Sequence, residues 1–457
     1  MPKNKTVYVC NDCGAKFGQW QGQCGDCGEW NTIFETPVIS DRVDRGTKYS
    51  GYSGQTLPKI QSMTEIRLDE IPRISSTMAE MDRVLGGGLV PGSVVLLGGD
   101  PGIGKSTLLL QILCQLPAHL GSLYVTGEES LSQVTLRARR LGLPERNIKL
   151  LAETNIDCIT RLALQEKPRI IVIDSIQTMY LQDIASAPGS VSQVRETAAH
   201  LARFAKQTNT MMFLIGHVTK DGGVAGPRVL EHIMDAVIFI EGRADSRFRI
   251  MRAMKNRFGA ANELGVFAMT ETGMKEVKNP SAIFLSRLDD PAPGSVVMVI
   301  WEGSRPLLVE IQALMDESHG ESPKRVTVGM EQNRLAMLLA VLHRHGGIPA
   351  YDQDIFINIV GGVNVRETSA DLALLLALVS SLRSRALPRD LVVFGEVGLS
   401  GEIRPVASGT ERLREAAKHG FKRAIIPKAN APRGGVDGME LIPVMFLSEA
   451  LVAIRDA

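Results

Sequence analysis

Residues Gly98–Thr107 read GGDPGIGKST, and this stretch decides the fold of the chain. Within it, Gly99–Ser106 fits the spacing G-x-x-x-x-G-K-[ST] of a phosphate-binding loop. The apolar run Ser93–Leu97 before the loop predicts a buried strand, and Leu108–Leu113 after it predicts the start of a helix. Because the motif requires this strand–loop–helix context, we favour a nucleotide site over a glycine-rich turn that binds nothing.

Each part of the loop has a predicted role. The glycines let backbone N–H groups approach phosphate oxygens, and the helix N-terminus adds its dipole. Lys105 is expected to place its charge on the β- and γ-phosphates of ATP, and Ser106 to ligate Mg2+ through its hydroxyl. The predicted nucleotide-binding residues are Gly99, Asp100, Pro101, Gly102, Ile103, Gly104, Lys105, Ser106 and Thr107.

The composition is that of an ordinary globular protein with two or three domains. The chain has 457 residues, of which 44% are hydrophobic and 22% charged, and a formal net charge of +1. A chain-wide basic surface is excluded, so any nucleic-acid contact must be local. The N-terminus shows no apolar signal core, and runs such as Leu372–Val379 are too short to span a bilayer. We therefore expect a cytoplasmic protein without membrane contact.

Four of the six cysteines fall in the first 27 residues, as two C-x-x-C-G units. Four thiolates suit tetrahedral Zn2+ and leave no open position, which predicts a structural zinc module over residues 1–35. Its ligands would be Cys10, Cys13, Cys24 and Cys27. A redox pair or two disulfides are the alternatives, which a cytosolic chain disfavours. Trp20 and Trp30 are expected to pack on the metal core, and a contact with nucleic acid or a partner stays open.

Apolar strands alternate with amphipathic helices from Ile66 onward. The preceding residues 36–65 are rich in Ser, Gly, Pro and charge, and are predicted to be a flexible linker. Residues 66–273 are predicted to form an α/β domain with a mainly parallel sheet. Besides the strand before the loop, strands are expected over Ser122–Thr126, Arg169–Asp174 and Met211–His217.

Ligands bind at the carboxyl ends of parallel strands, so Glu128, Asp174 and His217 should lie near Lys105. Asp174 ends its apolar strand as a Walker B carboxylate does, and would hold Mg2+ through water. Glu128 is the favoured general base for the attacking water, with Glu129, or two solvated loop acids, as alternatives. His217 either senses the γ-phosphate or is a structural histidine.

Two further segments, residues 182–191 and 220–228, are rich in glycine, proline or serine. Such loops with sparse cations suit a mobile nucleic-acid contact. Ordinary surface loops have the same composition, so both interpretations stay open.

These motifs, with GHVTKDG at Gly216–Gly222, resemble the RecA-like ATPases, and KNRFG at Lys255–Gly259 matches a motif of the bacterial RadA (Sms) recombination proteins. The order of zinc knuckles, ATPase domain and C-terminal domain resembles that family along nearly the whole chain. The motif resembles the Lys-x-Arg finger of DnaB-type helicases, which reaches the nucleotide of the neighbouring subunit. The resemblance therefore implies that Lys255 and Arg257 stabilise phosphate charge in trans. Residue chemistry alone predicts a solvated basic turn after a strand over Phe248–Met254.

The resemblance implies a DNA-dependent, helicase-type ATPase that works as a homo-oligomeric ring, with six subunits expected. Such a motor would move on single-stranded and branched DNA and promote branch migration with RecA in DNA break repair. The implied cofactors are ATP, Mg2+ and Zn2+. The predicted catalytic residues are Lys105, Glu128, Asp174, Lys255 and Arg257. The rival functions are an ATP-dependent protease and a nucleotide-switched DNA clamp that does not translocate.

Residues 274–457 predict a separate α+β domain. Its expected strands and helices lie at Ser295–Trp301, Leu307–Ile311, Arg334–His343, Asp354–Val360, Ser369–Ser381, Leu391–Phe394 and Arg423–Ile426. This domain resembles the proteolytic domain of Lon, with Ser369 at the place of the nucleophile. Glu411 stands where that family has its lysine, and a serine without a base is a poor nucleophile. We therefore predict no protease activity and a helix-capping role for Ser369.

Cations are in excess over one part of this domain. Residues 380–428 contain ten Lys/Arg and five Asp/Glu. Such an excess is typical of a phosphate-backbone surface, although a mixed solvated face has the same composition. The family resemblance adds a role as the platform on which a ring of subunits is built.

Overall fold

The chain divides into two compact units, residues 1–51 and 52–457. The computed structural model describes residues 6–10, 13, 15–37, 62, 73–145, 148–217, 230–242, 246–283, 285, 292–320 and 322–456. Among the helices in these ranges, none is long and apolar enough to cross a membrane.

The N-terminal unit is a small antiparallel sheet. Its strands are β1 (Thr6–Cys10), β2 (Lys16–Phe17) and β3 (Ile33–Pro37), in the order β2-β1-β3. Only Cys10, Cys24 and Ile33 form its buried apolar cluster among the described residues. A core this small needs a staple such as a metal ion.

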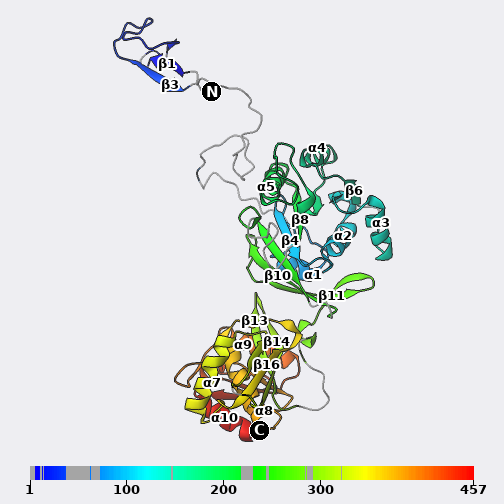
Figure 1. The fold of residues 1–457 in the computed structure, drawn as a ribbon, viewed down its shortest axis with the longest axis vertical. Coiled ribbons are helices and arrows are strands. Elements are labelled where there is room, and N and C mark those ends of the chain that lie inside the picture. The colour runs from blue at the N-terminus through cyan, green and yellow to red at the C-terminus, as the bar shows by residue number, and fades with distance from the viewer. Residues whose placement is uncertain are drawn as a thin grey trace. The chain divides into compact units, whose positions relative to one another are not determined.

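The second unit begins with a nine-stranded sheet in the order β12-β11-β10-β9-β4-β8-β7-β5-β6 (Figure 1). The strands from β6 to β9 along this order run parallel, and β10, β11 and β12 continue the sheet antiparallel. The strand bounds are β4 Val94–Gly99, β5 Ser122–Thr126, β6 Ile148–Ala152, β7 Ile170–Asp174, β8 Met211–His217, β9 Ala236–Glu241, β10 Phe248–Asn256, β11 Leu264–Thr270 and β12 Gly273–Glu276. The predicted parallel sheet is confirmed.

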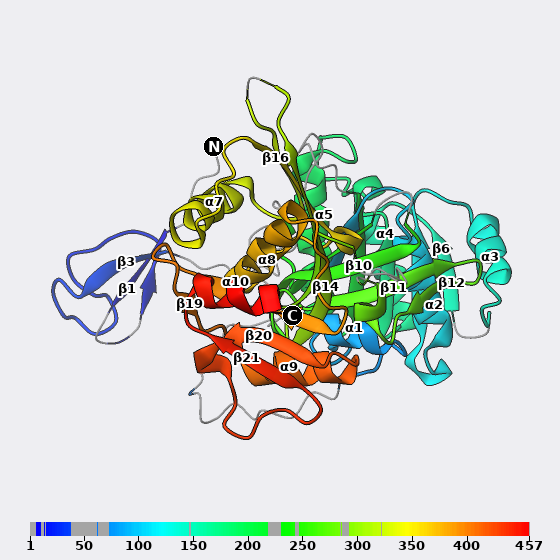
Figure 2. The same cartoon turned by 90° about the horizontal axis from the view of Figure 1, so that it is seen from below.

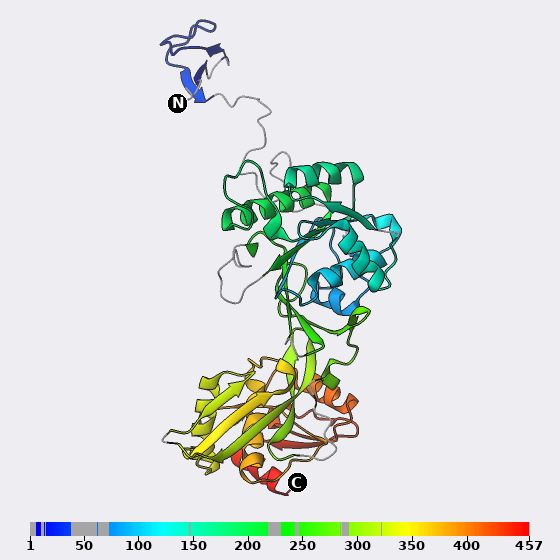
Figure 3. The ribbon, with the colours of Figure 1, turned by 45° about the vertical axis from the view of Figure 1, so that its right-hand side comes forward.

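Helices cover both faces of this sheet, as the near-continuous apolar central strands require. The helices are α1 (Ala79–Val84), α2 (Lys105–Gln115), α3 (Leu131–Arg140), α4 (Ile156–Glu166) and α5 (Val191–Thr208). The first three share one apolar cluster with the sheet, and α4 and α5 share another. Figure 3 shows the blue and cyan helices on one side of the sheet and α4 and α5 on the other.

The C-terminal domain is built on a seven-stranded mixed sheet in the order β15-β16-β14-β13-β17-β20-β21. Its strands are β13 Ser295–Glu302, β14 Arg305–Glu317, β15 Arg325–Val328, β16 Gln353–Ile359, β17 Leu391–Val393, β20 Arg423–Pro427 and β21 Glu440–Val444, and a separate pair is β18 Glu396–Val397 and β19 Ile403–Arg404. Its helices are α7 Gln332–Gly346, α8 Asp371–Leu382, α9 Gly409–Lys418 and α10 Leu447–Asp456. Every element predicted for this domain is present.

Two apolar clusters hold this domain together. The cluster around α8 also contains α7 and α10, and the cluster on the other side contains α9 (Figure 2). Helix α8 is buried all round from Leu372 to Val379, which explains its continuous apolar sequence.

The nine-stranded sheet and the seven-stranded sheet are joined through the β13–β14 hairpin. Arg305 at the start of β14 donates both terminal nitrogens to the carboxylate of Glu80 in α1, each over 3.0 Å. Arg252 on β10 pairs with Glu302 at the end of β13 over 2.6 Å. These paired charges fix the hairpin tip against the nine-stranded sheet.

Replacing Arg305 should destabilise the chain far more than replacing Arg83, which pairs with the same carboxylate. The Arg305 side chain is 15% exposed, whereas the Arg83 side chain is 39% exposed. The Nε atom of Arg83 lies 3.6 Å from Oε1 of Glu80. Removing one partner of a buried pair costs about 3 kcal/mol, whereas an exposed pair contributes about 0–1 kcal/mol. Chemical denaturation of Arg305→Ala beside Arg83→Ala measures the difference, and equal losses would contradict this account of the hairpin.

Candidate active site and metal centre

The phosphate-binding loop joins β4 to α2 as predicted. Three of its glycines have a positive φ, which favours glycine: +147° at Gly99, +75° at Gly102 and +114° at Gly104. A Cβ at Gly99 would lie 2.6 Å from the carbonyl oxygen of Ile240, and one at Gly104 2.6 Å from Cε of Met269. The loop therefore packs closely against β9 and β11 while α2 begins directly at Lys105.

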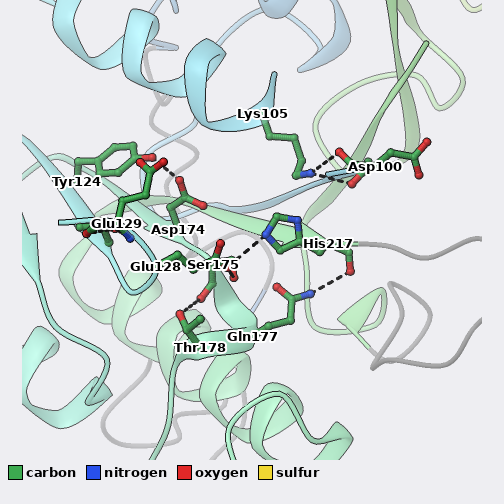
Figure 4. Close-up of polar contacts among 12 residues, drawn as sticks. Asp100, Lys105, Tyr124, Glu128, Glu129, Asp174, Ser175, Gln177, Thr178 and His217 are labelled. Carbon is green, nitrogen blue, oxygen red and sulfur yellow. Dashed lines mark hydrogen bonds and ion pairs between the residues drawn. The ribbon is translucent and has the colours of Figure 1, made fainter. Parts of the chain in front are cut away.

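Lys105 is only 4% exposed and points back over the loop. Its ammonium donates to the carbonyl oxygens of Gly99 and Asp100 over 2.7 and 2.9 Å (Figure 4). Burial lowers the pKa of Lys105, and the nearby carboxylates of Asp174, Asp100 and Glu128 raise it. The cation is thus held at the loop by weak carbonyl acceptors, which a phosphate group can replace.

Asp174 ends β7 and is buried, as the apolar strand before it predicts. The Tyr124 hydroxyl donates a hydrogen bond to Oδ2 of Asp174. Sequence reasoning missed Tyr124, because an aromatic residue in an apolar strand is typical of a core position. Ser106 and Asp174 supply the hard oxygen donors that Mg2+ prefers, so these residues fit a magnesium ion.

The two glutamates after β5 have different surroundings (Figure 4). Glu128 accepts a hydrogen bond from the Ser175 hydroxyl, and its Oε1 lies 3.3 Å from Nε2 of His217. Glu129 forms an ion pair with Arg137 on α3, and its backbone N–H donates to the Thr126 hydroxyl over 3.0 Å. Glu129 thus has a structural role in its ion pair with α3, whereas Glu128 faces the end of β8.

His217 lies where β8 ends, beside Glu128. Its backbone carbonyl accepts a hydrogen bond from the Gln177 side chain over 3.1 Å. Its Nδ1 is buried and has no hydrogen-bond partner among the described residues. The four strand ends that were expected to carry the chemistry therefore meet at one edge of the sheet.

Lys255 and Arg257 lie at the opposite edge of the same sheet. Asn256 pairs with Ala236, the first residue of β9, and Ala236 pairs with Val95 near the start of β4. At about 3.3 Å per strand residue, this edge is on the order of 15 Å from the phosphate-binding loop. Within one chain the finger motif therefore does not meet the nucleotide site.

The finger motif has partners of its own within the chain. The Lys255 ammonium donates to the carbonyl oxygens of Met234, over 2.9 Å, and Glu231. Arg257 Nη1 lies 2.9 Å from Oδ1 of Asp235, a buried carboxylate that Lys206 also approaches to 3.3 Å. These contacts hold the basic turn in place after β10.

The structure describes one of the two glycine-rich segments that were considered as nucleic-acid contacts. Residues 220–228 lie outside the described residues. In residues 182–191, the buried Gln193 amide donates to the carbonyl oxygens of Ile184 and Ser186 over 3.2 and 3.0 Å. This loop is fixed to α5, which favours a surface loop over a mobile contact.

The four N-terminal cysteines form a cluster that fits zinc. Their ligand sulfurs all lie within 4.8 Å of one another. Cys10 and Cys27 are 3.7 Å apart at Sγ, and Cys13 and Cys24 are 3.5 Å apart. Four sulfurs at about 2.3 Å from a tetrahedral Zn2+ are about 3.8 Å apart, whereas a disulfide needs about 2.05 Å. The cysteines therefore suit a structural metal ion and are not disulfide-bonded.

The expected packing of the tryptophans on the metal core is wrong. Trp20 is 59% exposed and Trp30 is 65% exposed. The side chains that pack against the buried cysteines are instead Tyr8, Ala15 and Phe17. The tryptophans thus present an aromatic surface on the module.

The Lon-like site also differs from the prediction. Ser369 is 2% exposed and lies in a short 3-10 turn before α8; it makes no capping hydrogen bond, so its predicted cap role is wrong. Its hydroxyl lies 3.2 Å from Nη1 of Arg412, which is 1% exposed. Glu411 is exposed, and Arg412 is the α9 residue that lies beside the Ser369 hydroxyl. The sequence did not single out Arg412, because the rotation of α9 decides which of the two adjacent side chains, Glu411 or Arg412, faces inward.

Arg412 cannot act as the missing base. Its guanidinium donates to both carboxylate oxygens of Glu367, over 3.0 and 2.8 Å, and to the carbonyl oxygen of Val299. An arginine side chain stays protonated in proteins and has no acceptor atom. The buried arginine therefore ties α9 to β13 and to the residues before α8.

The cation-rich segment is not one phosphate surface. Arg412 is buried, and Arg404, Lys418 and Arg423 pair with Glu402, Glu415 and Asp390, respectively. By contrast, Arg383 and Arg385 line a cavity of about 280 Å³ together with Arg455. Basic side chains therefore gather at that cavity. Many of the other arginine and lysine side chains of the segment are paired with nearby carboxylates.

Comparison with known proteins agrees with this architecture. Residues 64–223 match the model of an AAA domain, residues 8–35 that of a rubredoxin metal binding domain, and residues 303–430 that of subunit ChlI of Mg-chelatase. The chain is 62% identical over 450 residues to the DNA repair protein RadA of Haemophilus influenzae, covering 98% of both chains. It is 61% identical to the Escherichia coli protein of that name and 45% identical to that of Bacillus subtilis, with 99% of each chain covered.

Ser369 should be inert toward serine-directed reagents. A fluorophosphonate probe needs a nucleophilic hydroxyl, and this one is buried beside an arginine that cannot accept its proton. We expect no labelling of the native chain and no difference from Ser369→Ala, measured by mass spectrometry after incubation with the probe. Labelling that Ser369→Ala abolishes would contradict the assignment of an inactive site.

Proposed function

The chain belongs to the family of RadA DNA repair proteins, and on that premise we propose that it is a DNA-stimulated, helicase-type ATPase. It would act as a ring of subunits, with six expected, on single-stranded and branched DNA, and promote branch migration with RecA in DNA break repair. The observation that carries the ATPase step is the meeting of Lys105, Asp174 and Glu128 at one edge of the sheet. The surroundings of each residue suit a different task in hydrolysis.

In this proposal Mg2+, when bound, would supply positive charge at the β- and γ-phosphates. Ser106 would hold the ion through its hydroxyl, and Asp174 through water. Lys105 exchanges its two loop carbonyls for phosphate oxygens, and backbone N–H groups of the glycine loop take the remaining oxygens. The protein thus provides fixed donors where negative charge develops, which is the main source of catalysis in phosphoryl transfer.

Glu128 would orient and deprotonate the attacking water. Ser175 and His217 both approach its Oε1, so the carboxylate is held near the end of β8 with Oε2 available for the water. Glu129 is unsuited to this role because Arg137 pairs with one of its carboxylate oxygens and the other oxygen is buried. His217 would report the state of the γ-phosphate through its contact with Glu128.

The position of the finger motif supports a ring. Lys255 and Arg257 lie at the edge of the sheet away from their own nucleotide site. A neighbouring subunit that presents this edge to the phosphate-binding loop would bring two cations to the nucleotide. Hydrolysis would then depend on the contact between subunits, as with an arginine finger supplied in trans.

Two features support a DNA contact. The cavity lined by Arg383, Arg385 and Arg455 gathers cations, and phosphate contacts of this kind supply sequence-independent affinity for DNA. The exposed Trp20 and Trp30 offer aromatic faces of the sort on which bases stack. Family membership favours DNA as the ligand of these surfaces.

Glu128→Gln and Glu129→Gln form a matched pair that tests the general base. Loss of a positioned base slows a reaction by about 10²–10⁴-fold, so Glu128→Gln should bind ATP and turn it over at least about 100-fold more slowly. Glu129→Gln should keep turnover within a few-fold and lose thermal stability, because it removes one partner of the Arg137 pair. Steady-state ATP hydrolysis measures both, and the reverse pattern would overturn the assignment.

Mixing variants tests the finger in trans. Arg257→Ala should bind ATP and hydrolyse it slowly, and Lys105→Ala should not hydrolyse it at all. Mixed rings contain some interfaces with an intact loop facing an intact finger, so activity should partly return when the two are combined. Absence of any rescue, with mixed assembly verified by pull-down, would contradict a shared site.

A further inference from the structure

Tyr124 contacts the carboxylate that is expected to hold the magnesium ion through water. It lies in the middle of β5 and is 0% exposed. Its hydroxyl donates to Oδ2 of Asp174 on β7. We propose that Tyr124 is a positioning residue, which orients the Asp174 carboxylate for Mg2+–nucleotide binding.

Packing alone does not explain a tyrosine at this position. Its neighbours Leu123 and Val125 are buried apolar residues, and phenylalanine would fill the same core. A buried hydroxyl costs free energy unless it is hydrogen-bonded. Here the hydroxyl has a partner, Asp174, which belongs to the proposed nucleotide site.

The hydrogen bond fixes which carboxylate oxygen is available. Because Oδ2 accepts the phenol proton, Oδ1 is the oxygen left to accept from a metal-bound water. A donor with a fixed ring orientation limits rotation of the carboxylate before any ligand binds.

The register of the sheet explains how the side chain reaches the carboxylate. Thr126 on β5 is paired with Asp174 on β7, so Tyr124 lies two residues back along the neighbouring strand. Residues two apart on a strand project from the same face, and a tyrosine is long enough to reach diagonally.

This inference rests on the proposed ATPase site. One binding experiment tests the magnesium site in the native chain and the role of Tyr124 in a variant. A fluorescent non-hydrolysable ATP analogue is titrated into the full-length chain in EDTA and in saturating Mg2+. The affinity in Mg2+ divided by the affinity in EDTA gives the increase in nucleotide affinity that the metal causes. For Tyr124→Phe we expect this ratio to fall about tenfold, which is the effect of losing one hydrogen bond to a charged group, with the affinity in EDTA unchanged within about twofold. Tyr351→Phe removes the same atom from a residue that is 70% exposed and should match the native chain.

A double-mutant cycle with Asp174→Asn shows whether Tyr124 acts through the carboxylate. If it does, Tyr124→Phe should lower the ratio little further in the Asp174→Asn background. Additive losses, or an equal fall of both affinities, would show a structural role and overturn the inference. A native-like ratio in Tyr124→Phe would overturn it too, with the ATPase proposal intact. Absence of any Mg2+ gain in the native chain would instead contradict the proposed magnesium site itself.

Discussion

A parallel sheet presents the carboxyl ends of its strands at a single edge, and the chemistry of this chain depends on that constraint. β4, β5, β7 and β8 deliver Lys105, Glu128, Asp174 and His217 to that edge. The finger motif lies at the opposite edge, because it follows β10, and β10 runs antiparallel to β9. In the proposed ring, a neighbouring chain would bring the finger motif to the phosphate-binding loop.

The sequence predicted most of this site, because its signals are local. Glycines with positive φ, a lysine at a helix start and an aspartate after an apolar run each depend on neighbouring residues. Tyr124 could not be found in this way, since its hydroxyl acts across strands and its aromatic ring is what a core strand favours anyway. The proposed preference for Glu128 over Glu129 likewise rests on a contact between elements, the ion pair of Glu129 with Arg137 on α3.

The C-terminal domain shows the same limit. Its strands and helices follow from periodicity, but the identity of the residue beside Ser369 depends on the rotation of α9, which turns Arg412 inward and Glu411 outward. Net charge along a segment likewise says nothing of which cations already have partners, as Arg404 and Arg423 do. The bidentate pair of Arg305 with Glu80 joins this domain to the ATPase sheet from 225 residues away, beyond the reach of any local pattern.

ATP turnover with and without single-stranded DNA, at low and high salt, tests the central claim most directly. With Lys105→Ala as the blank, the account predicts hydrolysis that DNA stimulates, and a stimulation that weakens as salt rises, because phosphate contacts release counterions. A turnover rate that is the same with and without DNA at both salt concentrations would contradict a DNA-coupled motor.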